Sequence, residues 1–562
     1  MKLQFDEVRR LTGPSILWQR AGAVVDVLCD DVDQGKVGQV WHKWSSELLA
    51  AIGWEHETSV SRFFSGGASF AISAPLDALY TACDLAELIW ACCEAELMGG
   101  PPPNIDAVLP SIKASLREES NPRLLQIIDS AAQHQVLVLS DDDELSLGAG
   151  AAVKTWPLCE LPDPQSLDWP SFHAIPIALI TGTNGKSTSV RLAAEMAKAA
   201  GKMAGVTSTD FVKVGDDVIE HGDYSGPGGA RLLLRDPRTE IAFLEVARGG
   251  ILRRGLPIEQ AQAALITNVA SDHLGQYGID TVEELAEVKF VVAKALSPSG
   301  VLVLNADNDL VVEQAKKLDQ MLCWFSLDNQ HPLVQQQINS GGRAVTLRDS
   351  IIHLYDREGE HAVLALDRIP MTFNGFAKHN VKNALGVVGL CAALGLPLTA
   401  IREGLQNFAS DPSDNPGRGN QYDVAGANVI VDFAHNGHGM RAVAKMAKAM
   451  PANRRIVMFG HAGDRSDDDI ADLTNAVMEM QADYYIVTEY EHYLRGRALG
   501  DIPKLVRSIL EGNGVTLAQI TVAPDPVTGT QLALDMASPG DTLLLFVLDQ
   551  RDQVHQLLQQ ST

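Results

Sequence analysis

Short apolar runs separated by helical stretches dominate the chain from about residue 171 onward. The runs are IPIALI, EIAFLEV, AALITNV, GVLVLNAD, NVIVDF, RRIVMFG, DYYIVTE and DTLLLFV. Continuous aliphatic and β-branched runs are typical of strands buried on both faces, and their alternation with helices predicts parallel sheets covered by helices. The expected fold class is therefore α/β. The proline- and glycine-rich segment SDPSDNPGRGN at 410–420 predicts a break between two α/β units.

The first third of the chain has a different pattern. The run GAVVDVL predicts a strand, and the alanine-rich stretch APLDALYTACDLAELIWACCEAEL predicts a long helix that ends at the breaker GGPPPN. A smaller α+β domain is therefore expected first. Two helices, the short strand VLVLS and a proline-spaced linker follow it. We expect four units in chain order, at residues 1–107, 108–170, 171–409 and 410–562.

Composition narrows the classes of function. A formal net charge of −26 would repel a phosphate backbone, which argues against nucleic acid as a partner. No apolar run approaches the roughly 20 residues that span a bilayer, so we expect a cytoplasmic protein without membrane contact. The 7 cysteines lack metal-ligand spacing and are expected to be reduced packing residues.

A phosphate-binding loop is predicted directly after the strand IPIALI. The sequence TGTNGKST at 181–188 leads into the helical stretch SVRLAAEMAKAAG. Glycines let backbone N–H groups approach phosphate oxygens, the lysine contacts the β and γ oxygens, and the serine hydroxyl ligates Mg²⁺. A glycine turn without a ligand is the alternative interpretation. The predicted nucleotide contacts in this loop are Gly182, Thr183, Asn184, Gly185, Lys186, Ser187 and Thr188.

Further polar motifs follow the loop in order. They are Glu245 in LEVARGGILRRGL, Asp272 and His273 in SDHLG, Lys289 in AEVK, Asn305 in LNADN, Asn383 in GFAKHNVKNALG, Arg418 in PGRGN, Asp432 and His435 in VDFAHN, and Asp464 and Arg465 in GHAGDRSDDD. With TGTNGKST they resemble the Mur ligase and folylpolyglutamate synthetase superfamily. The resemblance implies an ATP-dependent ligase that forms amide bonds through an acyl-phosphate. It also implies a central P-loop ATPase domain followed by a C-terminal Rossmann-like domain.

The same resemblance assigns roles around the phosphates. Ser187 would hold the Mg²⁺ that bridges the β and γ phosphates, and Glu245 and His273 would hold a second Mg²⁺ against the acceptor. Lys289 corresponds to a lysine that Mur ligases often carry as a carbamate, although a plain helix-surface lysine is the alternative. The implied catalytic set is Lys186, Glu245, His273, Lys289 and Arg418.

Four residues are implied to contact the rest of the nucleotide. Asn305 and Asn383 resemble adenine-side contacts, whereas Arg418 and Asp432 resemble residues that a mobile C-terminal domain brings to the γ-phosphate and ribose. Read from residue type alone, Asp432 is equally a helix cap and Arg418 a surface charge. Asp464 and Arg465 are equally a turn and a salt bridge.

Within the superfamily, four strings resemble the C-terminal half of the cyanophycin synthetase family: YSGPGGARLLLRDP, EVARGGILRRGL, TEYEHYLRGRALG and PGDTLLLFVLD. LTGPSILW and NPRLLQIIDSAAQHQVLVLSDDDELSLGAGA resemble its opening and the entry to its ATP-grasp module. The linker that follows is too short for an ATP-grasp catalytic unit. The resemblance thus implies the site that attaches an amino acid to an aspartyl carboxylate, without the site that extends the aspartate backbone. Gly229 stands where the family pattern has serine, which puts one acceptor contact in question.

Substrate contacts are predicted from charge. Arg231, Arg248 and Arg253 are candidates to bind an anionic acceptor, with exposed helix arginines as the alternative. Acidic residues of the C-terminal unit are candidates to receive a cationic amine donor, although a solvated acidic surface explains them equally. These acidic residues are Asp467, Asp468, Asp469, Glu489 and Glu491.

Two other classes of function stay open at this point. One is a nucleotide-binding subunit without its own chemistry that supports a separately encoded ATP-grasp ligase. The other is a polymer-binding module confined to the first hundred or so residues, which is compatible with catalysis. We expect small-molecule or peptide substrates, ATP and Mg²⁺ as cofactors, and a homo-oligomer. The identity of the acceptor and donor does not follow from the sequence.

Overall fold

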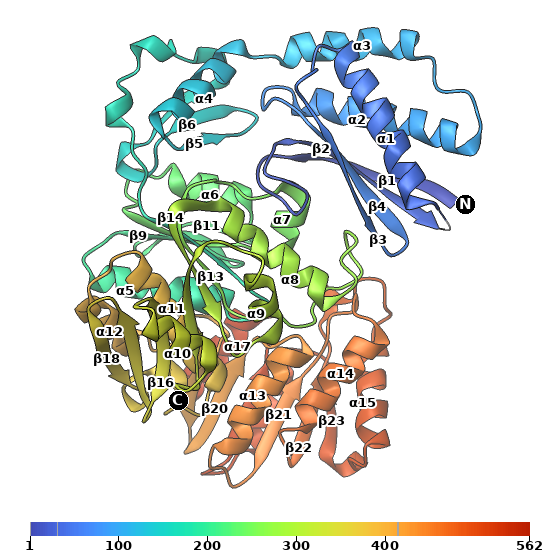
Figure 1. The fold of residues 1–562 in the computed structure, drawn as a ribbon. Coiled ribbons are helices and arrows are strands. Elements are labelled where there is room, and N and C mark those ends of the chain that lie inside the picture. Colours follow the sequence, from blue (N-terminus) through green and yellow to red (C-terminus); the bar gives the residue numbers. More distant parts are fainter. Residues whose placement is uncertain (1, 31, 413–414) are drawn as a thin grey trace.

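The computed structural model describes residues 2–30, 32–412 and 415–562 (Figure 1). Of the predicted break at 410–420, residues 413 and 414 lie outside the described part. The eight apolar runs of the α/β region all form strands, and the fold class predicted from them is confirmed. None of the helices in the described ranges is both long and apolar enough to cross a bilayer.

The N-terminal domain is a four-stranded antiparallel sheet packed against two long helices (Figure 1). Its strand order is β1-β2-β4-β3, and the elements are β1 (Lys2–Leu11), β2 (Gly22–Asp30), α1 (Gln34–Ala51), β3 (Ser59–Phe64), β4 (Gly67–Ser73) and α2 (Leu79–Met98). Three aromatic rings in contact, Trp41, Phe70 and Trp90, fill the space between sheet and helices. α2 ends at Gly99, whose φ of 74° is the left-handed cap that glycine favours.

A small bracket of helices and a three-stranded sheet connects this domain to the next. It contains α3 (Ile105–Glu119), α4 (Pro122–His134), β5 (Val138–Ser140), β6 (Glu144–Leu147) and β7 (Lys154–Pro157). α3 spans the expected boundary at residue 107 and buries Ile112 in the core of the N-terminal domain. Asp142 binds Arg10 of β1, and Asp141 binds Arg235 of the central domain. The bracket therefore ties the two domains together.

The central domain is built on an 11-stranded sheet with the order β11-β10-β9-β12-β8-β13-β14-β15-β16-β17-β18. Its middle strands are parallel, and antiparallel hairpins extend both edges. The strands are β8 (Ile177–Thr181), β9 (Ala204–Thr207), β10 (Phe211–Val214), β11 (Asp217–His221), β12 (Ile241–Glu245), β13 (Ala261–Ile266), β14 (Leu296–Asn305), β15 (Met321–Ser326), β16 (Arg343–Arg348), β17 (Ile351–Asp356) and β18 (Gly359–Ala365).

Helices cover both faces of this sheet and enclose two hydrophobic cores. One face carries α5 (Lys186–Ala199), α11 (Lys378–Ala393) and α12 (Leu398–Asn407). The other face carries α6 (Pro227–Leu234), α7 (Arg248–Arg254), α8 (Val282–Phe290), α9 (Asp309–Ala315) and α10 (Pro332–Asn339). The carboxyl ends of β8, β12 and β13 meet at one edge, where ligands bind in open α/β sheets.

The C-terminal domain has a six-stranded sheet with the order β19-β20-β24-β21-β22-β23. Neighbouring strands are parallel except for the pair β19 and β20, which is antiparallel. The strands are β19 (Asn420–Val424), β20 (Ala427–Asp432), β21 (Arg455–Phe459), β22 (Tyr484–Thr488), β23 (Ile520–Ala523) and β24 (Thr542–Phe546). One face carries α13 (Gly437–Ala449), α14 (Asp467–Met478) and α15 (Asp501–Gly512), and the other carries α16 (Pro526–Met536) and α17 (Arg551–Ser561).

Candidate active site

The phosphate loop connects β8 to α5 and is shaped by two glycines. Gly182 has φ 150° and Gly185 has φ 88°, and a Cβ on Gly185 would lie 2.3 Å from Oδ1 of Asn383. No other residue fits there. The ammonium of Lys186 donates to the carbonyls of Gly182 and Thr183, both at 3.1 Å. The lysine side chain thus lies over its own loop. A bound phosphate would replace those carbonyls as the hydrogen-bond acceptor of the ammonium.

The hydroxyls that follow the lysine are buried at the start of α5. Ser187 lies 3.3 Å from the hydroxyl of Thr209, which is in the loop after β9. Thr188 accepts a hydrogen bond of 3.4 Å from Asn415, in the connection to the C-terminal domain. Ser187 therefore faces a loop of its own domain, while Thr188 contacts the linker.

Glu245 ends β12, next to β8, and its side chain is 2% exposed. Neither carboxylate oxygen has a hydrogen-bond partner among the described residues. A buried ionised carboxylate without partners is costly, and a divalent cation is the kind of group that satisfies it. The orphaned oxygens of Glu245 therefore fit a Mg²⁺ ligand.

The loop after β13 brings a second group of ligand-type side chains to the same edge. Atoms of Asp272, His273 and His435 lie within 4.8 Å of one another. Burial opposes ionisation of Asp272, but His273, His435 and Arg465 outweigh it and hold the pKa of that carboxyl below its usual value. Burial lowers the pKa of His435 to about 4, so its imidazole is neutral at pH 7. Neutral imidazoles beside a carboxylate are a competent donor set for a divalent cation.

Lys289 lies near the end of α8 and is 3% exposed. Burial, reinforced by the charges of Lys186 and Arg248, lowers the pKa of its amine well below the usual value. The surface-lysine alternative considered from the sequence therefore does not describe this side chain. A buried amine that has lost its proton is a nucleophile, which is the state that reacts with CO₂ to form a carbamate.

A cavity of about 410 Å³ lies between the central and C-terminal domains. Seven of the residues predicted to contact the nucleotide line it, namely Asn184, Gly185, Thr188, Asn305, Asn383, Arg418 and Asp432, whereas Gly182, Thr183, Lys186 and Ser187 do not. Burial raises the pKa of Asp432 to about 6, although backbone N–H groups and Arg418 oppose the shift.

Asn305 and Asn383 serve the cavity in different ways. The amide of Asn305 donates to the carbonyl of Thr267 at 2.9 Å and accepts from the N–H of Asp307 at 3.0 Å. The amide of Asn383 donates to Oδ1 of Asn380 at 3.2 Å, and its own oxygen closes on Gly185. Asn305 thus has internal partners that fix its orientation, while Asn383 packs directly against the phosphate loop.

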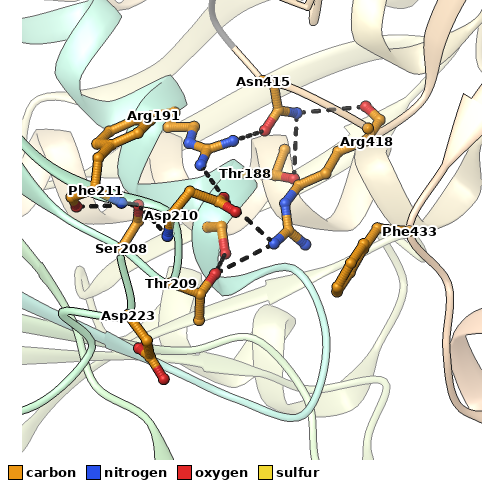
Figure 2. Close-up of polar contacts among 12 residues, drawn as sticks. Thr188, Arg191, Ser208, Thr209, Asp210, Phe211, Asp223, Asn415, Arg418 and Phe433 are labelled. Carbon is orange, nitrogen blue, oxygen red and sulfur yellow. Dashed lines mark hydrogen bonds and ion pairs between the residues drawn. The ribbon is translucent and has the colours of Figure 1, made fainter. Parts of the chain in front are cut away.

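Asp210 joins three arginines from three parts of the chain, and Figure 2 shows two of them, Arg191 and Arg418. Arg191 of the phosphate-loop helix is buried and pairs with Oδ2, and Nη2 of Arg418 lies 3.8 Å from the same oxygen. Arg551, the first residue of α17, donates twice to Oδ1 at 3.0 Å. Burial opposes ionisation, but the three cations lower the pKa of Asp210 to about 2.

The geometry around Asp210 places Arg418 near the phosphate loop. Nη2 of Arg418 donates to Thr209 at 3.4 Å, and Thr209 contacts Ser187. The guanidinium lies 5.1 Å from the ring centroid of Phe433, and Nε is buried without a hydrogen-bond partner. Arg418 therefore keeps donors for an anion that arrives at the phosphate loop. Figure 2 shows Arg191 and Arg418 converging on Asp210, with Thr209 beside the guanidinium of Arg418.

The three arginines predicted to bind substrate lie in different surroundings. Arg248 donates to the carbonyl of His273 and to Gln276, each at 2.6 Å, so it supports the loop that carries His273. Arg231 lies 3.8 Å from Asp141 of the bracket. Arg253 lines a groove of about 820 Å³ between β1 and the start of α6. Of the three, Arg253 is the one whose guanidinium is open to a large ligand.

The acidic residues predicted to receive the donor are mostly engaged with the C-terminal domain itself. Asp467 pairs with Arg497 at 2.7 Å, Asp469 accepts from the α14 cap Ser466 at 2.8 Å, and buried Glu489 accepts from the N–H of Gly500. Asp464 pairs with Arg495. Arg465 points to the other side, 3.7 Å from Asp272 and 3.3 Å from His273.

The residues that sequence reasoning missed are Arg191, Asp210 and Arg551. Each lies outside the polar motifs, and their contacts appear only when the strands are stacked in space. The motif VDFAHN already supplied His435, and Asn436 was within reach of the same motif, since it follows the end of β20 by four residues.

Two family models match the two domains that form this site. The model of the Mur ligase middle domain matches residues 180–391, and that of the Mur ligase glutamate ligase domain matches residues 417–546. The chain belongs to the Mur ligase family of ATP-dependent ligases. The two matched segments carry the phosphate loop, Glu245, His273 and Lys289 in the first and Arg418 and Asp432 in the second.

Cyanophycin synthetases are among its curated relatives. The protein of Nostoc sp. is 38% identical over 332 residues, which cover 59% of this chain and 37% of that protein. The protein of Synechocystis sp. is 36% identical over 373 residues, covering 66% of this chain and 42% of that protein. The chain therefore spans about two fifths of the length of these relatives. A UDP-N-acetylmuramoyl-L-alanyl-D-glutamate–2,6-diaminopimelate ligase of Clostridium botulinum is 28% identical over 301 residues, covering 53% of this chain and 58% of that protein.

Among solved structures, E. coli FolC in complex with DHPP and ADP superposes with a TM-score of 0.50. The sequences are 20% identical, and the match covers 68% of this chain and 88% of that chain. At this identity the likeness concerns the fold alone, and it places this chain among Mur ligase and FolC-like folds.

Proposed function

We propose that the chain joins the amine of an amino acid or peptide to a carboxylate of an aspartate-containing acceptor, using ATP. The observation that carries the proposal is the convergence at one edge of the central sheet. There the phosphate loop with Lys186, the orphaned carboxylate of Glu245 and the loop with His273 lie beside Arg418 of the C-terminal side. A cation-rich cleft between two domains suits the transfer of a phosphoryl group.

In the first step, an acceptor carboxylate oxygen attacks the γ-phosphorus of ATP. The bond from that phosphorus to the β–γ bridging oxygen breaks, and the products are an acyl-phosphate and ADP. Lys186 and Arg418 neutralise charge on the transferred group, and Arg418 is held for this by Thr209 and Asp210. Closure of the two domains around this cavity would exclude water that hydrolyses the acyl-phosphate.

Ser187 together with Glu245 and His273 would hold Mg²⁺. Bound Mg²⁺ supplies positive charge to phosphate and acceptor oxygens. Lys289, as the free amine or as a carbamate, lies behind this group and near Asp272. The fit rests on the two unpartnered oxygens of Glu245 and on the Asp272, His273 and His435 cluster.

In the second step, an amine that has lost its ammonium proton attacks the acyl carbon. A C–N bond forms, the C–O bond to phosphate breaks, and inorganic phosphate leaves with the proton released from nitrogen. Arg465 of the C-terminal domain lies close to Asp272 and His273 and would suit the carboxylate of an incoming amino acid.

Charge supports the choice of substrates. The groove lined by Arg253 also contains Arg9, Arg10 and Arg254, which favours an acidic acceptor. Similarity to cyanophycin synthetases supports arginine, lysine or peptides carrying them as donors. The carboxylates of the C-terminal domain support a cationic donor less than the sequence suggested. Asp467 and Glu489 already have partners within that domain.

The experiment is a matrix of acceptors and donors scored by ADP release and product mass, with Lys186→Ala as the matched inactive variant. Short aspartate-containing peptides with arginine or lysine should give ADP and one amide product. Preference for glutamate as donor, or for a UDP-sugar as acceptor, would contradict the proposed substrates. Stoichiometric nucleotide binding without ADP release in any combination would instead support a non-catalytic subunit.

A second experiment addresses the missing ATP-grasp unit. Incubated with ATP, aspartate and arginine but without peptide primer or a partner ligase, the chain should form no polymer. Only the short bracket of α3 to β7 stands where that unit would be. Insoluble polymer from the free amino acids would show that the chain extends an aspartate backbone unaided.

A further inference from the structure

The N-terminal domain contacts the central domain at several places, among them the ends of β1 and β3. At the end of β1, the N–H of Thr12 donates to the carbonyl of Arg254 at 2.9 Å. At the end of β3, Arg62 and Phe64 reach the loop at 273–279, between β13 and α8. The sheet of the N-terminal domain lies above this part of the central domain, close to α8 (Figure 1). The second contact touches the loop that carries His273.

This loop has an unfavourable backbone that needs support from outside. The φ angles of His273, Gly275, Tyr277 and Gly278 are 51°, 84°, 56° and 64°. A left-handed conformation costs a non-glycine residue on the order of 1 kcal/mol or more. Two of the four residues are not glycine, so the loop keeps this shape only where neighbouring groups hold it.

Arg62 provides such support through a forked contact. Nη1 donates to the carbonyl of Gly278 at 3.0 Å, and Nη2 lies 3.3 Å from Oε1 of Glu284. The side chain is 17% exposed, so water competes little for these bonds. The ring of Phe64 lies against Gly278, where a Cβ would be 2.2 Å from Cδ1. Loop and strand therefore fit closely at this point.

Glu284 extends the contact to the helix that carries Lys289. Its second oxygen accepts from the N–H groups of Asp280 at 2.9 Å and Thr281 at 3.0 Å, which completes the capping box of α8. Arg62 thus binds both the loop of His273 and the capping residue of the helix of Lys289.

We propose that the N-terminal domain positions the metal-facing side of the active site, with Arg62 as the positioning residue. We call the contacts of Arg62 with Gly278 and Glu284 the brace. The brace acts on loop 273–279 and on the start of α8, and through them on His273 and Lys289. Its consequence for catalysis rests on the proposed ligase function, whereas its effect on the loop does not. This gives the domain a role in a chain without an ATP-grasp unit.

The test compares Arg62→Ala with Arg20→Ala in the full chain. Arg20 is a matched control, since it lies in the same domain, is 56% exposed on its side chain and has one long ion pair of 3.9 Å with Glu57. Hydrogen–deuterium exchange is followed in peptides covering 271–284. We expect exchange there to rise about tenfold in Arg62→Ala and to stay unchanged in Arg20→Ala.

A second readout is the Mg²⁺ dependence of ADP release. The Mg²⁺ concentration for half-maximal activity should rise about three- to tenfold in Arg62→Ala, with the KM for ATP nearly unchanged, because residues 271–284 do not line the nucleotide cavity. Arg62→Lys, which keeps the charge but not the fork, should fall between the two. Melting curves of all variants separate loop loosening from loss of the domain.

Two results would overturn the brace. One is unchanged exchange over 271–284 in Arg62→Ala. The other is a rise spread evenly over the N-terminal domain, which would make Arg62 a residue of domain stability. If the wild-type chain releases no ADP with any acceptor, the proposed function fails, yet the exchange experiment still decides whether the brace exists.

Discussion

The side-chain amides of Asn184 and Asn436 pair reciprocally across the domain boundary. Nδ2 of Asn184 donates to Oδ1 of Asn436 at 3.2 Å, and Nδ2 of Asn436 donates to Oδ1 of Asn184 at 3.1 Å. One amide belongs to the phosphate loop and the other follows β20. The C-terminal domain is therefore closed onto the loop that would hold the phosphates.

Asn436→Asp tests this pair without removing a helix cap. Oδ1 of Asn436 also accepts from the N–H of Gly439 at 2.8 Å, and an aspartate keeps that bond. The donor to Asn184 is lost, and a negative charge is added beside the phosphates. We expect the KM for ATP to rise about tenfold, which corresponds to about 1.4 kcal/mol. The measurement is ADP release as a function of ATP concentration.

Asn453→Asp is the control for that substitution, since Asn453 is an exposed residue of the same domain with a bond to the carbonyl of Pro539. It adds the same charge far from the cavity and should leave the KM for ATP unchanged. Equal effects of the two variants would mean that net charge, and not the amide pair, governs nucleotide affinity.

Asp210 and Arg551 form a second connection between the domains, and a double-mutant cycle measures it. Arg551→Ala leaves the buried pair of Arg191 and Asp210 intact, so the fold should be retained. Without the connection, closure and the placement of Arg418 both weaken. We expect kcat for ADP release to fall about tenfold in Arg551→Ala and in Asp210→Asn, with a coupling of about 1 kcal/mol or more between them.

Arg507→Ala provides the comparison for Arg551→Ala. Arg507 is a half-exposed helix arginine paired with Glu511 four residues on, and its loss should change kcat little. Fully additive effects of the Asp210 and Arg551 substitutions would contradict the connection.

The parts of the site that the sequence predicted are those that end buried strands. Glu245 and Asp432 stand directly after apolar runs, and in parallel sheets such positions meet at one edge. The phosphate loop was readable for the same reason, because strand, glycines, lysine and helix follow one another without a gap.

The contacts around Asp210 were out of reach for a different reason. Its partners Arg191 and Arg551 are 19 and 341 residues away in the sequence. They lie in two helices, and the sequence pattern of one helix does not predict that it lies near the other. Arg248 shows the same limit. Its charge suggested a substrate contact, but the structure directs the guanidinium to the carbonyl of His273. The direction of a long side chain depends on packing between elements, which a local pattern does not contain.

Lys289 provides a prediction about covalent chemistry. Its buried amine has a lowered pKa, so it is able to attack CO₂, lose a proton and form a carbamate whose negative charge would suit a divalent cation. In ¹³C-bicarbonate the wild-type chain should show a carbamate carbon signal that Lys289→Arg lacks. Lys289→Arg should also lose most of its ADP release. A missing carbamate signal in the wild type at saturating Mg²⁺ and bicarbonate would mean that the free amine is the working form.

His461 gives a prediction about pH and stability. It is 4% exposed, Nε2 has no hydrogen-bond partner among the described residues, and burial together with the charges of Arg465 and Arg497 lowers the pKa of its imidazole to about 3. The ordinary value is about 6.5, so between these values the unfolded chain binds the extra proton and the folded chain does not. The contribution of His461 to stability is therefore complete above about pH 6.5 and is lost as the pH falls toward 3, with a slope of about 1.4 kcal/mol per pH unit. We expect the melting temperature of the C-terminal domain to fall more steeply with acidification in the wild type than in His461→Gln, whose side chain does not titrate.

His492→Gln is the matched control, because that histidine is exposed and its pKa is raised by Asp549. Replacing it should leave the fall of melting temperature with acidification as steep as in the wild type. Parallel curves for wild type and His461→Gln between pH 6.5 and 4.5 would show that His461 is not held neutral in the folded chain.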